Sequence, residues 1–365
     1  MAAGVTHPPL RFAALTRLTH GSKLVTVLHT VPRATTLDCV FDTPSGEDRD
    51  VLAGRHVLAR IVYGHQGGQP TLYQGSPRLD VHMMAESAVP FTEAWVTDRP
   101  VRSGLQDNLV YAEDGEHFFC AVRIEESGVY REAVHAAYGA ALRMAWQQGY
   151  TDLFRMWNLV GDITGDNAEG TEIYQDFCAG RALAFEEWSE HFEGIPAATG
   201  IGSLGTGIDL YFLACRPGRT THLENPRQTP AHRYPDRYGT LSPSFARGTH
   251  LASEGYGTGA LYVSGTASIL GDDTVHPGDI ERQLDVTLAN IEALVSGENL
   301  RQHAVDAGYG LTELDSVKVY VRDAEHLPAV RARCAEVFSG AADVVFLNVG
   351  ICRPDLLVEM EGICR

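Results

Sequence analysis

The pattern of hydrophobic and polar positions changes along the chain, and it predicts strands in some segments and helices in others. Runs rich in β-branched and aromatic residues, separated by Gly, Pro or acidic clusters, predict strands at 24–31, 56–63 and 117–124. Apolar residues recurring every three or four positions predict helices over 130–148 and 173–192, and Gly149 is the expected C-terminal cap of the first. A short apolar run at 210–214 predicts another strand.

The last hundred residues have the clearest pattern. Strands are predicted at 260–269, 314–322, 343–349 and 356–363, and amphipathic helices at 280–296 and 327–338. The resulting order is strand, helix, strand, helix, strand, strand. This order predicts an α+β fold in which helices pack on one face of a mixed sheet.

Residues 216–259 interrupt this regularity with a stretch rich in Pro, Arg, Tyr, His and Gly. Such long irregular segments inside a compact chain are usually functional loops or linkers. Five arginines lie between Arg216 and Arg237, and Arg247 follows. They stand out because the chain as a whole is strongly acidic.

Charge and composition exclude several classes of partner. The 365 residues include 47 acidic and 29 basic side chains, a formal net charge of −18. This charge argues against binding to nucleic acid or to an anionic membrane surface, but a few converging arginines can still bind a small anion. No run of 18 apolar residues and no signal peptide is present, so we expect no membrane partner and a cytoplasmic location.

Cysteines, histidines and glycines supply no recognisable metal or cofactor motif. The seven cysteines are scattered without a CxxC pair, which argues against disulfides or a zinc site and fits a reducing compartment. The fifteen histidines show no HxH, HxxxH or HExxH spacing. No P-loop is present, and no GxGxxG motif is followed by an acidic residue in the arrangement of a dinucleotide-binding site. We therefore expect no metal and no cofactor.

Several motifs resemble known families. The C-terminal YVSGTAS strand, QLDVTLANIEALV helix, VKVYVR strand and CRPDLLVEMEGI strand resemble the YjgF/RidA superfamily. Farther upstream the chain resembles chorismatases, which cleave chorismate in pathways that supply polyketide starter units. The motifs that carry this second resemblance are RMWN (155–158), YQDFCAGRALAF (174–185), PAATGIG (196–202), ENPRQ (224–228), YP…YG (234–239) and PSFAR (243–247).

The resemblance implies a fold with two RidA-like (chorismate mutase-like) halves. We place the first domain at residues 1–205 and the second, which carries the catalytic glutamate, at 206–365. RidA proteins commonly form trimers with sites between subunits, whereas a chain with two such halves could build its site internally. We therefore expect a monomer.

The chemistry of chorismate sets what its site must contain. Its two carboxylates need cations, best supplied by the planar guanidinium of arginine. Its enolpyruvyl ether is activated when the methylene carbon is protonated. This step needs a general acid that keeps its proton near neutral pH, as a carboxyl group in an apolar setting does.

Glu359 is the candidate acid, because the resemblance places it at the position of the chorismatase catalytic glutamate. It lies on an apolar strand, and strand alternation points Glu361 to the same face. From the sequence alone, solvation of both glutamates is an equally good interpretation. Cys352 and Gly265 match the subtype that releases 3-hydroxybenzoate, whereas hydrolytic chorismatases have a β-branched residue and alanine at these positions.

The arginines inside the family-like motifs, Arg155, Arg227 and Arg247, are the candidate carboxylate clamps, and Tyr234 is the candidate hydroxyl donor. Arg353 ranks lower, since it could pair locally with Asp355. RidA proteins bind carboxylate through an arginine on the strand before the closing one, and 343–349 carries none. This departure argues against a plain RidA-type deaminase.

The favoured function is a chorismatase that forms 3-hydroxybenzoate and pyruvate. The alternatives are a hydrolytic chorismatase that forms a trans-dihydroxycyclohexadiene carboxylate and pyruvate, or a variant that also makes 4-hydroxybenzoate. A RidA-like binding or imine-deaminating protein is a third possibility. A purely structural or interaction protein is the fourth.

Overall fold

A computed structural model of the chain describes residues 37–42, 54–85, 90–239, 241–253 and 259–365, which belong to one compact unit. The strand predicted at 24–31 lies outside the described residues. Among the described helices, none is long and apolar enough to span a membrane.

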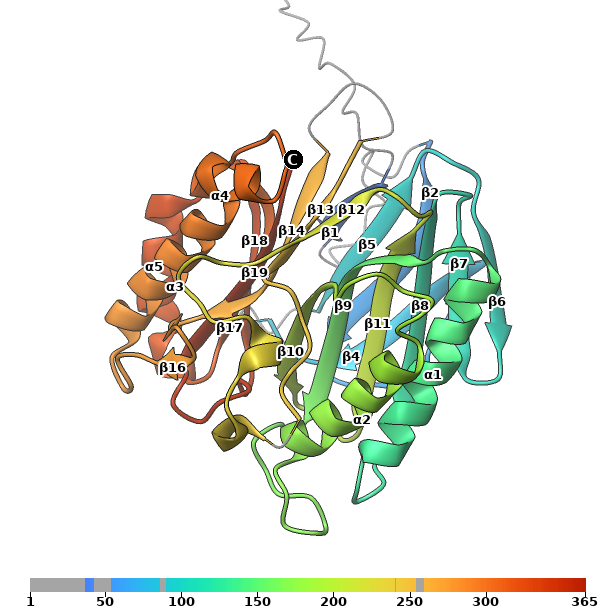
Figure 1. The fold of residues 1–365 in the computed structure, drawn as a ribbon, viewed down its shortest axis with the longest axis horizontal. Coiled ribbons are helices and arrows are strands. Elements are labelled where there is room, and N and C mark those ends of the chain that lie inside the picture. Colours follow the sequence, from blue (N-terminus) through green and yellow to red (C-terminus); the bar gives the residue numbers. More distant parts are fainter. Residues whose placement is uncertain (1–36, 43–53, 86–89, 240, 254–258) are drawn as a thin grey trace, which may run out of the picture. The chain divides into compact units, whose positions relative to one another are not determined.

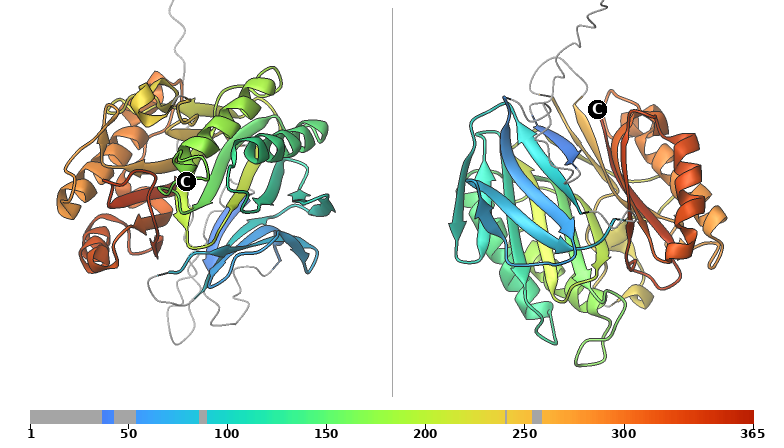
Figure 2. Two further views of the ribbon diagram at one scale, coloured as in Figure 1. Left: turned by 90° about the horizontal axis from the view of Figure 1, so that it is seen from below. Right: turned by 180° about the vertical axis from the view of Figure 1, so that it is seen from behind.

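The first sheet has five strands, in the order β1-β5-β2-β4-β3. Their bounds are β1 (Leu37–Asp42), β2 (His56–Gly64), β3 (Thr71–Tyr73), β4 (Ser76–His82) and β5 (Phe91–Thr97). Only β2 and β4 are parallel within it. Figure 2 shows this sheet, in blue, beside the other two sheets on the side away from their helices.

The second sheet has six strands, in the order β10-β9-β11-β8-β7-β6. It consists of β6 (Arg102–Gln106), β7 (Leu109–Glu113), β8 (His117–Ile124), β9 (Asp152–Gly161), β10 (Ala197–Ser203) and β11 (Ile208–Cys215). Helices α1 (Arg131–Gln147) and α2 (Ile173–Glu187) cover one face (Figure 1). After α1 the chain turns at Gly149, whose φ of +80° favours glycine.

The third sheet has six strands, in the order β12-β13-β14-β19-β17-β18. It consists of β12 (Thr220–Leu223), β13 (Gly248–Leu251), β14 (Ala260–Ala267), β17 (Leu314–Val321), β18 (Asp343–Asn348) and β19 (Val358–Cys364). Helices α3 (Ile280–Val295) and α5 (Leu327–Val337) cover one face, and α4 (Gly297–Gln302) follows α3. Strands β15 (Ile269–Leu270) and β16 (Asp273–Thr274) form a separate small hairpin.

The second and third sheets repeat one topology. Strands β6, β7, β8, β11, β9 and β10 occupy the places that β12, β13, β14, β19, β17 and β18 occupy in the third sheet. In both sheets the pair at one edge is parallel, and the last strand in sequence lies antiparallel between two others. The predicted boundary at residue 205 falls before β11, and the pairing of β11 with β8 and β9 ends the first repeat at Cys215. The first sheet lies outside the repeat.

Three hydrophobic cores hold this arrangement together. One lies among the three sheets, and the other two lie between each six-stranded sheet and its helices. Strand β8 shows the consequence for the sequence: Phe119 and Ala121 face the central core, whereas Phe118, Cys120 and Val122 face the helices. A strand buried on both faces reads as a continuous apolar run rather than an alternating one.

The α+β class and the mixed sheets with helices on one face are confirmed. The predicted strands at 56–63 and 117–124 correspond to β2 and β8, and the C-terminal elements occur in the predicted order. Helix α2 ends at Glu187 rather than at 192, although Trp188 and Phe192 remain buried and so preserve the apolar spacing. No strand was predicted at β9 or β10, whose apolar runs include polar residues of the candidate site.

Candidate active site

A β-bulge joins the two repeats at the place where the candidate site forms. The register of β14 against β19 shifts between Val263 and Thr266, so Ser264 and Gly265 leave the regular ladder. The Ala198 N–H donates to Ser264 Oγ (3.0 Å), and the Gly265 N–H donates to Thr199 Oγ1 (3.0 Å). Strand β10 of the first repeat is thereby bonded to β14 of the second.

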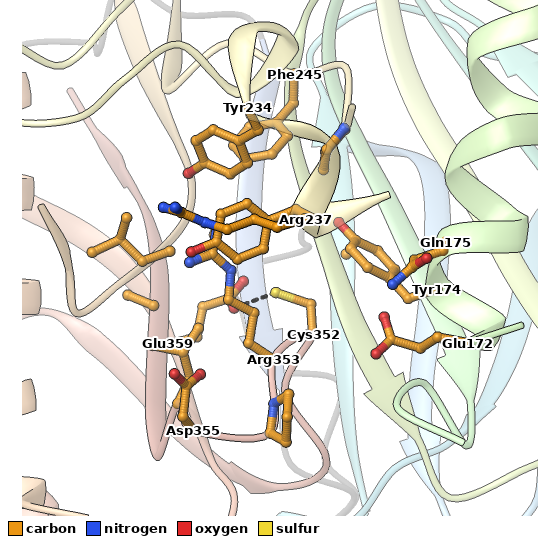
Figure 3. Close-up of a pocket in the computed structure, with 18 of the residues that line it drawn as sticks. Glu172, Tyr174, Gln175, Tyr234, Arg237, Phe245, Cys352, Arg353, Asp355 and Glu359 are labelled. Atoms are coloured by element: carbon orange, nitrogen blue, oxygen red, sulfur yellow. Dashed lines mark hydrogen bonds between the residues drawn. The ribbon is translucent and has the colours of Figure 1, made fainter. Parts of the chain in front are cut away.

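A cavity of about 370 Å³ opens beside this bulge (Figure 3). Its wall is built from α2 and β10 of the first repeat and from β14, β19 and the loops before them in the second. The side chains that line it include Glu172, Tyr174, Gln175, Tyr234, Arg237, Tyr238, Phe245, Arg247, Cys352, Arg353, Asp355 and Glu359. Gly265 also lines the cavity.

Glu359 is a buried carboxyl group that lines this cavity. It comes from β19, and its side chain is only 4% exposed. Burial, and after it the negative charge of Glu361, raise its pKa to about 8 against the opposing effect of Arg155, Arg247 and Arg353. Glu359 therefore keeps its proton at neutral pH, as a general acid must.

Glu361 faces the same side of β19 but is held as an anion. Its Oε1 accepts hydrogen bonds from Lys318 Nζ (2.8 Å) and Trp157 Nε1 (2.7 Å), and its Oε2 accepts one from Arg155 Nη2 (2.6 Å). Thr199 Oγ1 also donates to Oε2. Burial alone would raise the pKa of Glu361, but Lys318 and Arg155 lower it to about 2.

Lys318 connects this group to the first sheet. Its Nζ lies 2.6 Å from Glu93 Oε2 and also donates to the Tyr63 hydroxyl (3.1 Å). Glu93, Lys318, Glu361 and Arg155 form a buried charge cluster with two positive and two negative members. Its charges balance, which limits the cost of burying them.

Gly265 lies directly against the Glu359 carboxyl group. A Cβ atom at position 265 would lie 2.0 Å from Glu359 Oε1 and 3.2 Å from Thr199 Cγ2. A side chain here would force the carboxyl group to move. The absence of a Cβ at residue 265 therefore permits the observed position of the acid.

Cys352 lies on the other side of the same carboxyl group, with Sγ 4.0 Å from Glu359 Oε2. Burial, and then the nearby Glu359, raises the pKa of its thiol well above the usual range. The sulfur therefore stays protonated, and it can serve as a small neutral contact or weak donor rather than as a nucleophile.

Three arginines line the cavity. Arg247 is buried and donates through Nη2 to Thr229 O (2.8 Å) and the Tyr234 hydroxyl (2.6 Å), while its Nε has no hydrogen-bond partner among the described residues. The guanidinium of Arg353 lies 3.8 Å from the ring centroid of Tyr238 and donates to Asp272 O (2.9 Å). Arg237, more exposed, pairs with Asp272 and Asp273.

Comparisons with known proteins agree on one family. The family model described as "Chorismatase FkbO/Hyg5-like, N-terminal" matches residues 93–214. A 3-hydroxybenzoate synthase from Streptomyces hygroscopicus is 52% identical over 313 residues, 85% of this chain and 92% of that protein. A chorismatase from Streptomyces rapamycinicus is 40% identical, covering 91% and 99% of the two chains. The chain belongs to the chorismatase family.

The fold agrees with this membership. A solved chorismatase crystal structure superimposes with a TM-score of 0.86 at 41% identity, over 91% of this chain and 99% of that one. The resemblance inferred from the motifs, and with it the class of enzyme, is confirmed.

The structure brings together most of the candidate site residues of this chorismatase family member. Glu359, Cys352, Gly265, Tyr234 and Arg247 all line the cavity. Arg155 lies behind the cavity, and its guanidinium donates hydrogen bonds to Glu361 and Thr199. Arg227 has an exposed side chain outside the cavity. Among the described residues, only its backbone forms hydrogen bonds, with Asn225 Oδ1 and the Gly271 N–H.

Other residues of the cavity were missed or ranked too low. Arg353 faces the cavity, and its Nη1 bonds to Asp272 O and Thr274 Oγ1 rather than to Asp355. Arg237, Tyr174 and Phe245 were inside quoted motifs, yet nothing in their spacing showed which side chains point inward. Glu172 had no sequence signal at all.

Proposed function

We propose that this protein converts chorismate into 3-hydroxybenzoate and pyruvate, supplying an aromatic starter unit. The observation that carries the proposal is the buried Glu359 carboxyl group, protonated at neutral pH inside an arginine-lined cavity. The relative named 3-hydroxybenzoate synthase supports the choice of product.

Arg247 and Arg353 are the proposed carboxylate clamps. Both line the cavity, and both affect the pKa of Glu359. Tyr234 holds the Arg247 guanidinium in place through its hydroxyl, and Arg353 lies against the rings of Tyr234 and Tyr238. Arg155 supports the site from behind, and we assign no substrate contact to Arg227.

Glu359 is proposed to protonate the methylene carbon of the enolpyruvyl group, which leaves an oxocarbenium ion at the ether carbon. The resulting Glu359 carboxylate lies near the cations of Arg247 and Arg353, which favour the ionised form. The charge that forms on the acid is thus balanced locally.

The two chorismatase routes differ in atom balance. Hydrolysis adds one water and gives pyruvate and the diene diol, whereas formation of pyruvate and 3-hydroxybenzoate consumes no water and requires no oxidant. Gly265 and Cys352 are the residues that the family resemblance associates with the second route. Their contacts with Glu359 from two sides support a role in directing the protonated intermediate.

One experiment tests the proposal. The purified protein is incubated with chorismate, pyruvate release is followed with time, and the aromatic product is identified by chromatography. We expect stoichiometric pyruvate and 3-hydroxybenzoate. Pyruvate with the diene diol would favour the hydrolytic alternative, and the absence of pyruvate would reject both.

A RidA-type deaminase is less well supported. Strand β18 carries no arginine, and its Asn348 Nδ2 is already used by the carbonyls of Val321 (2.8 Å) and Arg322 (2.7 Å). Because one chain supplies the whole lining of the cavity, a monomer suffices for the proposed reaction. The monomeric state itself stays a prediction.

A further inference from the structure

The cavity has a second wall whose chemistry differs from that of the arginines. Glu172, Tyr174 and Gln175, at the start of α2, line the cavity from the first repeat. Figure 3 shows the Glu172 carboxylate pointing inward, toward the side where Cys352 lies. A carboxylate in a cavity that binds a dianion needs an explanation, because it repels the ligand's carboxylates.

Backbone hydrogen bonds fix the position of Glu172, whereas its carboxyl group has no partner among the described residues. The Ile173 N–H donates to Gly165 O (2.8 Å), and the Asp176 N–H donates to Glu172 O (3.0 Å). Although Glu172 is the N-cap residue of α2, its side chain accepts no capping hydrogen bond. The Glu172 carboxyl group forms no hydrogen bond or ion pair with any residue that the structure describes. Burial and the nearby Asp166 raise its pKa, which fits a carboxylate removed from bulk water.

Chorismate carries one functional group that suits such an acceptor. Its two carboxylates are ionised and can only accept hydrogen bonds, whereas its C4 hydroxyl can donate one. With the carboxylates held by Arg247 and Arg353, a free carboxylate on the opposite repeat is tolerated where it meets a donor. We propose that Glu172 accepts a hydrogen bond from the C4 hydroxyl of chorismate and so selects substrates that carry this hydroxyl. This inference rests on the proposed function.

Asp355 is the rival acceptor in the same cavity. It is exposed to solvent, and its Oδ1 already accepts a hydrogen bond from Thr274 Oγ1 (3.1 Å). Water therefore competes at Asp355 more than at Glu172, and the existing bond removes part of its capacity. These differences favour Glu172 for the hydroxyl.

The test compares chorismate with 4-deoxychorismate, in which hydrogen replaces the C4 hydroxyl. For the wild-type protein and the Glu172→Ala variant, the KM for chorismate and the competitive inhibition constant of 4-deoxychorismate are measured. We expect Glu172→Ala to raise the KM for chorismate roughly 10-fold, as for a lost hydrogen bond to a charged group, and to leave the inhibition constant within about twofold. Glu172→Gln retains an acceptor oxygen, so its KM for chorismate should lie between the values for the wild-type protein and Glu172→Ala.

Controls separate the possible failures. Glu186→Ala, an exposed residue on the same helix, should change neither constant. Equal changes for both ligands with Glu172→Ala, or no change for either, would overturn the inference. The inference would also be overturned if Asp355→Asn, but not Glu172→Ala, weakened the binding of chorismate and left that of 4-deoxychorismate unchanged.

Pyruvate release by the wild-type protein shows separately whether the proposed function holds. If Glu172→Ala fails to fold, the Glu172→Gln variant decides, since it must then raise only the KM for chorismate.

Discussion

Glu359 and Glu361 are chemically identical and lie two residues apart on one face of β19, yet they carry opposite protonation states at neutral pH. Glu361 is surrounded by Lys318, Arg155 and the donors Trp157 and Thr199. Among the described residues, no comparable set of donors surrounds the buried Glu359, and the negative charge of Glu361 raises its pKa. Two carboxyl groups with separated pKa values are a common arrangement at acid–base sites.

This difference predicts the pH dependence of turnover. Because Glu359 must be protonated to act and its pKa is about 8, kcat/KM should be constant below that pH and fall about tenfold per pH unit above it. The measurement is the rate of pyruvate release between pH 5 and 10, with Glu359→Gln as the inactive control. A profile that rises through pH 8 would contradict the assignment of Glu359 as the acid.

Gly265 makes a second prediction at the residue scale. An alanine Cβ would overlap Glu359 Oε1, the mobile end of a side chain, so we expect the protein to fold but the acid to be displaced. In the Gly265→Ala, Cys352→Val double variant, kcat should fall by roughly 10- to 100-fold and the product should shift toward the diene diol. Product ratios are measured by chromatography, with each single variant alongside. An unchanged ratio would remove both residues from the control of product.

At the scale of the element, β19 both holds the third sheet together and carries residues of the candidate site. It lies between β14 and β17 and pairs with both, and it carries both glutamates. Both faces of β19 are packed against cores. Val358, Met360 and Cys364 face the core beneath the helices, and Ile363 faces the central core. The last strand of the chain is therefore a central strand of its sheet.

We expect a chain that stops after Leu357 to lose soluble, cooperative folding rather than activity alone. Removing β19 leaves the hydrogen-bonding edges of β14 and β17 open and two of the three cores incomplete. A chain that stops after Cys364 keeps the whole strand and loses only Arg365, so it should fold and stay active. Circular dichroism and pyruvate release distinguish the two. Activity in the shorter chain would contradict the position of Glu359.

At the scale of the whole molecule, the buried charge cluster ties the three sheets to the site. Glu93 comes from the first sheet, Arg155 from the first repeat, and Lys318 and Glu361 from the second. Thr199 Oγ1 extends this cluster to Gly265 by accepting its N–H. The position of Glu359 thus depends on the packing of all three sheets.

Replacing Lys318 with Met should lower the free energy of unfolding by about 3–5 kcal/mol, because two buried carboxylates lose their shared cation. Urea unfolding followed by fluorescence measures this loss. The matched control is Arg333→Met, which removes the exposed pairs with Asp285 and Glu336 and should leave stability unchanged. A similar small effect for both variants would show that the buried cluster contributes little.

The sequence by itself determined the α+β class, most C-terminal elements and the shared face of Glu359 and Glu361, because these follow from local periodicity. It also revealed a local excess of arginine in an acidic chain. Only the family resemblance implied the repeat of the two six-stranded sheets, because their strands pair across long separations in the sequence. The end of the first repeat after β11 is defined by strand pairing alone.

Only the tertiary structure decided which arginines reach the cavity and which carboxyl group keeps its proton. Arg155 and Arg353 lie in similarly suggestive segments, but one is held by Glu361 behind the site and the other lines the cavity. Motif spacing does not encode this choice, because burial and the charges around each group come from elements that are distant in the chain. The pKa of Glu359 is in this sense a property of the packed molecule.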